Sequence, residues 1–410
     1  MPNDLVPAAD SSDDKEILVL CHRIPYPPNK GDKIRSFHMV RHLARQGWRI
    51  HLGALADDPN DLDYLDSLRP MCASLAVEPL TRWHKLRSGL GALKGTSFSV
   101  EYFHDGRLQR FVDDILARRT VSAALVVCAP MAEYLLSRAH QLPPRVVLDL
   151  MDVDSEKWRE YARRCAWPMS WVYSLEARLL GEYERLAGQI FDHVILVSEA
   201  EASLYRQVHG NSEKVTSVSN GVDLEYFSTN GTCPPQKQPK LVFCGAMDYY
   251  PNIDAVTWFA SDVLPLIRSK FPETQFWIVG ANPAAGVLTL ADKPGVHVTG
   301  SVDDVREFVA GASLSVAPMR IARGVQNKVL EAMAMGKAVL VTPQALEGID
   351  ANPGWDVAVA PCEPEAFAGA AVDLLREISS SAIMGARART QVERHYSWDA
   401  RLASLDELLR

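Results

Sequence analysis

Residues 323–341 bring a cation and a carboxylate together at the start of a predicted helix. The pattern predicts that the helix ends near Gly336 and that its buried face is formed by Val329, Leu330, Met333 and Ala334. Lys328 and Glu331, three residues apart, then lie in its first turns. The helix N-terminus and Lys328 would attract a diphosphate, and Glu331 can accept hydrogen bonds from ribose hydroxyls. On this segment alone, a solvated Lys/Glu pair is the competing interpretation.

Two arginines precede this helix in the sequence PMRIAR. Arg320 and Arg323, with Lys328, would gather three cations where a diphosphate would lie. Solvated surface arginines are the alternative.

Three predicted strands of the second half end in glycine, at Gly245, Gly280 and Gly300. A glycine at the carboxyl end of a parallel strand lets a ligand approach the backbone, and ligands of open α/β sheets bind at that edge. Each glycine alone is better explained by a tight turn, but the three together favour a binding crevice.

The first half carries a weaker anion-binding pattern. Gly31 opens a predicted amphipathic helix and is followed by Lys33 and Arg35, a set that can bind phosphate at a helix N-terminus. Asp152 and Asp154 spell D-x-D, a spacing that can hold Mg²⁺ or Mn²⁺ against a diphosphate. Because the donor-binding features lie in the second half and provide their own cations, we expect no metal and no cofactor.

The composition limits the classes of protein. A chain of 410 residues that is 47% hydrophobic and 23% charged can form two domains with full cores. The net charge of −8 argues against nucleic acid as a partner. Seven cysteines without a CxxC pair favour a reducing cytoplasm, and we expect neither a secretion signal nor a membrane span.

Apolar runs alternate with amphipathic segments, which predicts an α/β fold with parallel sheets. The predicted strands are 17–21, 49–54, 123–128, 145–150 and 193–197, then 240–244, 275–279, 296–299, 314–317 and 338–341. A proline-rich linker at 229–240 separates the halves. We expect a disordered tail at 1–15, a first domain at 16–222 and a second domain at 223–395, with a helix at 396–410 that can pack back on the first domain.

Residues 81–95 are unusually basic for this acidic chain. Arg82, Lys85, Arg87 and Lys94 alternate with Trp83, Leu86, Leu90 and Leu93 at helical spacing. Such a face can lie on anionic lipid, and a solvated charged face is the alternative. A second stretch, with Trp158, Trp167 and Trp171 among arginines, either extends this surface or packs an acceptor lid.

Several strings carry a resemblance, among them NGVDLEYF, LVFCGAMDYYPN, VTGSVDDVREFVAGASLSVAP, KVLEAMAMGKAVLV and YSWD. In this order they resemble the C-terminal domain of retaining GT-B glycosyltransferases of family 4. The first half is also similar, and the chain looks like bacterial sugar transferases associated with exopolysaccharide and PEP-CTERM systems. The resemblance implies two Rossmann-like domains facing across a cleft, with a nucleotide-sugar donor on the second and a glycan or polyprenyl-linked acceptor on the first. It also implies transfer with retention.

The resemblance also implies residue roles. Glu331 matches the second glutamate of the E-x7-E motif and is expected on the donor ribose, whereas Arg323 stands where the first glutamate usually lies. Gly300, Ser301 and Val302 match the loop beside the nucleotide base, and Asn327 is assigned to the same donor site. Asp152 or Asp154 is expected to orient or deprotonate the acceptor hydroxyl, and Arg323 with Lys328 to stabilise the leaving phosphate.

Two rival functions remain open. One is a nucleotide-sugar epimerase on the same fold, which would need no acceptor. The other is a catalytically silent nucleotide-binding scaffold, suggested by Arg323 in place of a glutamate and by Met151 in the histidine place of the D-x-H-D pattern. The lack of a G-x-G-x-x-G after a strand argues against an NAD enzyme.

Overall fold

The computed structural model describes residues 15–28, 30–91, 95–118, 120–210, 212–228, 238–322 and 325–410. The chain divides into two compact units. The N-terminal unit comprises Met1–Asn220 together with Arg401–Arg410, and the C-terminal unit comprises Gly221–Ala400.

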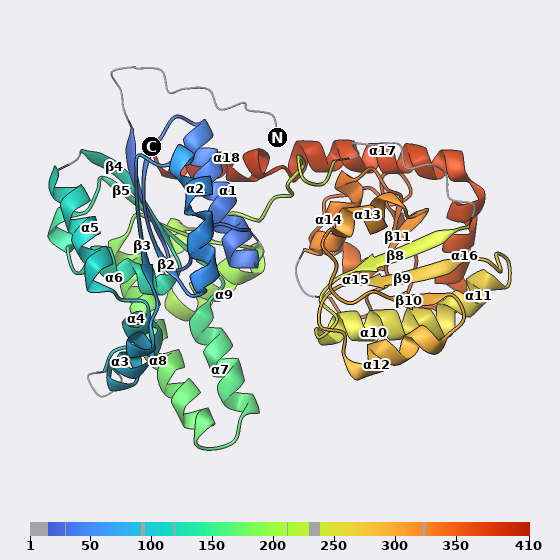
Figure 1. Cartoon of the computed structure of the whole chain (residues 1–410), viewed down its shortest axis with the longest axis horizontal. Coiled ribbons are helices and arrows are strands. Elements are labelled where there is room, and N and C mark those ends of the chain that lie inside the picture. Colours follow the sequence, from blue (N-terminus) through green and yellow to red (C-terminus); the bar gives the residue numbers. More distant parts are fainter. Residues whose placement is uncertain are drawn as a thin grey trace. The chain divides into compact units, whose positions relative to one another are not determined.

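The N-terminal unit is built on a seven-stranded parallel sheet with the order β3-β2-β1-β4-β5-β6-β7 (Figure 1). Its strands are β1 Glu16–Cys21, β2 Arg49–Ala56, β3 Ser74–Pro79, β4 Val121–Val127, β5 Arg145–Met151, β6 His193–Leu196 and β7 Val215–Ser217. The central strands are continuous apolar runs because helices cover both faces of a parallel sheet.

The helices of this unit include a long hairpin. They are α1 Gly31–Arg45, α2 Leu65–Leu68, α3 Arg82–Gly91, α4 Phe98–Tyr102, α5 Gly106–Arg118, α6 Glu133–Leu136, α7 Asp154–Arg164, α8 Met169–Ile190 and α9 Glu199–His209. The hairpin consists of α7 and α8, which project from the body of the unit (Figure 1). The last helix of the chain, α18 Trp398–Leu408, returns to this unit from Arg401 onward.

The C-terminal unit has a six-stranded parallel sheet with the order β10-β9-β8-β11-β12-β13. Its strands are β8 Lys240–Cys244, β9 Gln275–Val279, β10 Val296–Val298, β11 Leu314–Ala317, β12 Val339–Val341 and β13 Ala358–Val359. Its helices are α10 Tyr250–Trp258, α11 Leu264–Arg268, α12 Ala285–Leu288, α13 Val305–Ala310, α14 Asn327–Ala334, α15 Pro343–Leu346, α16 Pro364–Arg376 and α17 Ile378–His395.

The prediction of an α/β fold with parallel sheets is confirmed. Each of the ten predicted strands coincides with an observed strand, and β3, β7 and β13 were not predicted. The predicted linker at 229–240 lies mostly outside the described residues. Among the described helices, none combines the length and the apolarity that a crossing of a bilayer requires.

Candidate functional site

The start of α14 lies at the carboxyl edge of the second sheet, directly after β11 and its following loop. The Gln326 side chain does not cap this helix, so its first amides are not covered by a side chain from that position. Asn327 is exposed at the first helical residue, whereas Val329 and Leu330 are buried in the core. The helix therefore anchors its apolar face and presents its first turn at the edge where parallel sheets bind ligands.

Lys328 is held by a buried amide rather than by solvent. Its Nζ donates a hydrogen bond to Asn252 Oδ1 at 2.5 Å and lies 4.4 Å from the centroid of the Phe243 ring. Burial lowers the pKa of Lys328 to about 8, and the nearby Glu331 opposes this shift. The side chain is therefore a positioned ammonium that is still mostly charged at neutral pH.

Asn252 was not among the residues predicted from the sequence. This residue, 4% exposed on α10, also donates from Nδ2 to the carbonyl of Ala246 at 2.9 Å, which fixes the amide with its oxygen toward Lys328. The signal in the sequence is an asparagine seven residues after Gly245, the glycine that follows β8. The structure brings Asn252 and Lys328 together across 76 residues of sequence.

Glu331 lies one turn further along α14. Desolvation raises the pKa of this carboxyl group to about 7, against the attraction of Lys328. Within the described part of the chain, its oxygens accept no hydrogen bond from another protein group. A largely buried carboxylate with unused acceptor capacity is suited to hydroxyl groups of a ligand.

The predicted glycine ends meet at this edge. A Cβ added to Gly280 would lie 1.7 Å from the Gly245 carbonyl oxygen, so the two strand ends approach too closely for a side chain. A Cβ on Gly245 would lie 3.4 Å from Lys328 Nζ. Gly300 has a left-handed φ of 69°, and its carbonyl accepts a hydrogen bond from the Gly280 amide at 3.2 Å. Gly245 therefore borders the Lys328 ammonium directly.

The remaining predicted donor residues of this unit differ in their surroundings. Ser301 is exposed, and Val302 packs partly against the core. Arg320 forms a two-point ion pair with Asp254 of α10, including a contact of 2.9 Å from Nε, so an internal carboxylate already balances its charge. Arg323 lies outside the described residues.

In the N-terminal unit, the cations of α1 have partners inside the fold. Lys33 and Arg35 are each 1% exposed. Lys33 pairs with Asp61 at 2.5 Å, and Arg35 makes contacts of 2.7 and 3.0 Å with Asp149. Their charges are thus neutralised within the unit instead of being presented to a phosphate, which corrects the sequence-based expectation. Gly31 opens α1 with nothing within 4 Å of an added Cβ.

The carboxyl edge of the first sheet contains strained backbone. Cys128 after β4 and Met151 at the end of β5 have left-handed φ values of 81° and 64°. Such conformations in non-glycine residues cost free energy and cluster at functional sites. Asp152 follows at an exposed position, and burial raises the pKa of Asp154, although Lys157 lies 3.6 Å away.

A histidine at this edge was also missed. His22, directly after β1, places Nε2 3.1 Å from Asp32, which also accepts a 2.5 Å hydrogen bond from Arg23. Burial acts to raise the pKa of Asp32, but these two partners hold it below its ordinary value.

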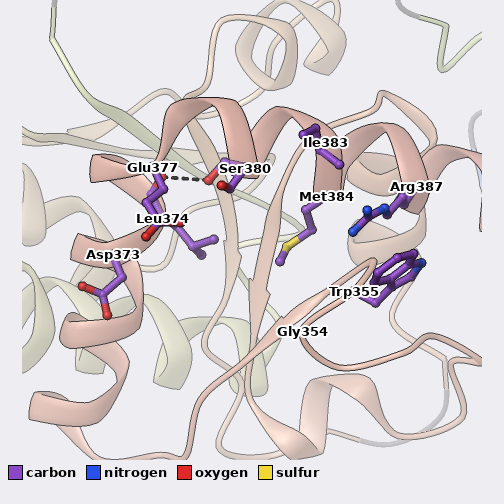
Figure 2. Close-up of a pocket in the computed structure, with 10 residues that line it drawn as sticks. Gly354, Trp355, Asp373, Leu374, Glu377, Ser380, Ile383, Met384 and Arg387 are labelled. Atoms are coloured by element: carbon purple, nitrogen blue, oxygen red, sulfur yellow. Dashed lines mark hydrogen bonds between the residues drawn. The ribbon is translucent and has the colours of Figure 1, made fainter.

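A separate concavity of about 460 Å³ lies at the junction of α16 and α17 (Figure 2). Leu374 and Met384 contribute apolar surface, and Trp355 packs against the Arg387 guanidinium at 3.4 Å. None of the residues predicted from the sequence lines this concavity.

The C-terminal unit matches a known family. Residues 238–377 match the family described as Glycosyl transferases group 1, and this segment contains Gly245, Asn252, Lys328 and Glu331. No curated protein sequence is significantly similar to the chain.

Solved structures resemble the whole chain. The sucrose-phosphate synthase of Thermosynechococcus elongatus has a TM-score of 0.64 at 17% identity, covering 96% of this chain and 98% of its own. Anabaena Alr3699/HepE in complex with UDP has a TM-score of 0.63 at 14% identity, with coverages of 96% and 99%. A Staphylococcus aureus TarM variant in complex with fondaparinux, α-GlcNAc-glycerol and UDP has 0.63 at 11%, with coverages of 97% and 100%.

At these identities the likeness establishes the fold, and it confirms the prediction of two Rossmann-like units. The chain has the GT-B fold and carries a glycosyl transferases group 1 domain, findings that support glycosyltransferase activity.

Proposed function

We propose that this protein transfers a sugar from a nucleotide-sugar donor to a glycan or lipid-linked acceptor with retention of configuration, as a member of family 4. The observation that carries the proposal is that Lys328 and Glu331 lie three residues apart on the first turns of α14. This helix belongs to the segment that matches group 1 glycosyl transferases. Glu331 would accept hydrogen bonds from the donor ribose, and Lys328 would contact the diphosphate.

Departure of the nucleoside diphosphate requires stabilisation of negative charge on the leaving phosphate. Lys328, fixed by Asn252, and the N-terminus of α14 would supply positive potential there. We propose that these groups suffice without a metal ion, with Arg323 as an additional cation. Lys328→Ala should lower the rate of transfer more than it weakens donor binding.

The acceptor would lie at the carboxyl edge of the N-terminal sheet. Asp152 is exposed there, and Asp154 has a raised pKa next to Lys157. We propose Asp152 as the group that orients the acceptor hydroxyl, with Asp154 as a second carboxyl group two residues away.

We also propose a role in exopolysaccharide or cell-envelope glycan synthesis on a polyprenyl-linked acceptor. The support is the sequence resemblance together with α3, which carries exposed Arg82, Trp83, Lys85 and Leu86 in a protein of net charge −8. A peripheral contact with an anionic membrane through residues 81–95 would bring the enzyme to such an acceptor.

The first test is thermal unfolding with UDP, GDP, ADP and their sugars, with and without Mg²⁺. A nucleotide at 100 times its dissociation constant stabilises the folded state by about 2.7 kcal/mol. We expect one nucleotide to stabilise the protein without metal, Glu331→Ala to abolish the shift, and the exposed α17 variant Glu393→Ala to retain it. No shift with any nucleotide would contradict the proposal.

Product analysis separates the transferase from its rivals. Consumption of the donor sugar only in the presence of acceptor supports transfer, whereas its conversion without acceptor would identify an epimerase. Nucleotide binding with neither reaction would identify a silent scaffold.

A further inference from the structure

Large apolar side chains are exposed on two helical elements of the N-terminal unit. Near the tip of the α7–α8 hairpin, Trp167 is 82% exposed and Trp171 is 61% exposed. On α3, Trp83 is 75% exposed and Leu86 is 60% exposed. Exposed tryptophans that gather on one region of a protein mark an interaction surface, because water contact with so much apolar area is unfavourable.

The hairpin does not need the exposed tryptophans for its own packing. A separate aromatic cluster lies between its helices, with Trp158 ring centroids 5.8 Å from Tyr161 and 5.4 Å from Tyr173. Tyr161 and Tyr173 are 6.1 Å apart. Trp167 and Trp171 lie outside this cluster, so the hairpin presents them on a scaffold that is already packed.

The hairpin and α3 belong to one connected surface. The short helix α4 packs against both α3 and α8. The Glu176 carboxylate of α8 accepts hydrogen bonds from Ser97 Oγ at 2.8 Å and from the amides of Phe98 at 2.7 Å and Ser99 at 2.9 Å. Trp171 lies about 7.5 Å along the helix axis from this anchor, at 1.5 Å per residue.

On its other side, α4 is tied to α3. Arg87 Nη2 donates to the Glu101 carbonyl at 3.0 Å, and His84 Nε2 lies 3.2 Å from Asp105 just beyond α4. His84 and Arg87 thus mark the inward face of α3, and helical spacing turns Arg82 and Leu86 outward. Both elements lie at the same end of the N-terminal unit (Figure 1).

Charge indicates what this surface binds. The helix α3 carries Arg82, Lys85 and Arg87 and no Asp or Glu, and residues 161–171 contain two arginines and no acid. The chain as a whole carries −8, whereas Arg82, Lys85 and Arg163 are exposed on the elements that carry the exposed tryptophans. Basic side chains next to tryptophan match the headgroup region of an anionic bilayer, where indole rings lie at the boundary of polar and apolar phases.

We propose that the outward face of α3 and the tip of the α7–α8 hairpin together form a lipid-binding surface, with Trp83, Leu86, Trp167 and Trp171 entering the headgroup region of an anionic membrane and Arg82, Lys85 and Arg163 contacting acidic headgroups. This inference deepens the membrane contact of the proposed function and rests on that function for its purpose, since it would place the N-terminal unit at a lipid-linked acceptor.

The test is co-sedimentation of the full chain with vesicles of phosphatidylcholine alone and of phosphatidylcholine with phosphatidylglycerol. We expect binding only to vesicles that contain phosphatidylglycerol, and weakening with added salt. Trp167→Ala/Trp171→Ala should weaken partitioning about tenfold. The matched control is Trp355→Ala, which removes a tryptophan that is 56% exposed in the C-terminal unit and should leave partitioning unchanged.

Two charge-reversal variants test the electrostatic contribution to vesicle binding. Arg82→Glu/Lys85→Glu should abolish the preference for phosphatidylglycerol, whereas Arg376→Glu, an exposed change on α16, should not. Equal partitioning of the wild type and Trp167→Ala/Trp171→Ala would overturn the proposal. A failure of the wild type to bind anionic vesicles would also overturn the proposal. Light scattering would then show whether these tryptophans mediate self-association instead.

The same variants separate this inference from the proposed function. Trp167→Ala/Trp171→Ala should retain nucleotide-dependent thermal stabilisation, which also shows that it is folded. Vesicle binding without any nucleotide-dependent shift would support the lipid surface and contradict the transferase. A nucleotide-dependent shift without vesicle binding would support the proposed function and contradict the lipid-binding surface.

Discussion

At the scale of single residues, the protonation of Lys328 should control donor binding. Burial places the pKa of this amine at about 8 in the free protein, and only the ammonium form attracts a diphosphate. The charged fraction falls as the pH rises through this value, so UDP affinity should decrease above about pH 8. A bound diphosphate favours the charged form, which places the decrease at or above that pH. Calorimetric titration of UDP between about pH 6.5 and 9.5 measures this dependence.

Two variants make the pH dependence diagnostic. Lys328→Gln should bind UDP more weakly than the wild type, by a smaller factor than its loss of transfer rate, and should show no alkaline decrease. Asn252→Asp places a carboxylate beside the ammonium, which stabilises its charged form and should move the decrease to higher pH. An unchanged alkaline limb in Lys328→Gln would assign the titration to another group.

The Arg35–Asp149 pair predicts a large stability effect. Both side chains are buried, and Arg35 also donates to the Val218 carbonyl at 2.8 Å and to Asn220 Oδ1 at 2.9 Å. Asp149→Ala would leave the guanidinium buried without its counter-ion, a change that typically costs about 3–5 kcal/mol. Urea unfolding measures the loss. The exposed pair Asp66–Arg69 is the control, because its removal should change stability by less than about 0.5 kcal/mol.

At the scale of elements, strand position decides what the sequence reveals. The interior strands β1, β4 and β5 have both faces covered and read as largely apolar runs, and Asp149 interrupts the run of β5. The three missed strands, β3, β7 and β13, all lie at sheet edges. β3 reads SLAVEP and is only half-buried, while β7 and β13 have three and two residues, too few for a periodic signal.

The residues of the candidate site also differ in how far the sequence alone could predict their role. Lys328 and Glu331 lie on one helix, so their spacing alone places them together. Lys33 and Arg35 have equally suggestive local spacing, but their partners Asp61 and Asp149 are 28 and 114 residues away. Local patterns cannot distinguish a phosphate-binding cation from a buried ion pair when the counter-ion comes from a distant strand or turn.

The close approach of the chain ends of β8 and β9 predicts the effect of a substitution at Gly280, directly after β9. An alanine Cβ at Gly280 would meet the Gly245 carbonyl at 1.7 Å, so the β8 end beside Lys328 must move. Gly280→Ala should destabilise the protein by about 1–3 kcal/mol and abolish nucleotide-dependent thermal stabilisation. Gly286→Ala in α12 is the control, since nothing lies within 4 Å of its added Cβ. Equal stability and equal nucleotide-dependent stabilisation of the two variants would show that nucleotide binding does not require the close approach of Gly245 and Gly280.

At the scale of the whole molecule, the N-terminal unit is completed by the end of the chain. Leu402, Leu405 and Leu409 are at most 2% exposed. His42 of α1 places Nε2 3.1 Å from both carboxylate oxygens of Asp406. The α18 segment that belongs to this unit therefore contributes three core side chains and the partner of a buried histidine.

Removal of residues 401–410 should accordingly weaken the N-terminal unit, because it removes three buried leucine side chains and leaves His42 without Asp406. The C-terminal unit, whose sheet and α14 receive no residue from this segment, should keep its local stability. Hydrogen exchange followed by mass spectrometry distinguishes the two, with faster exchange expected in α1 and unchanged exchange in α14. Asp406→Asn retains the leucines and should produce only a small part of the effect. Equal acceleration in both units would show instead that the two units unfold as one cooperative body.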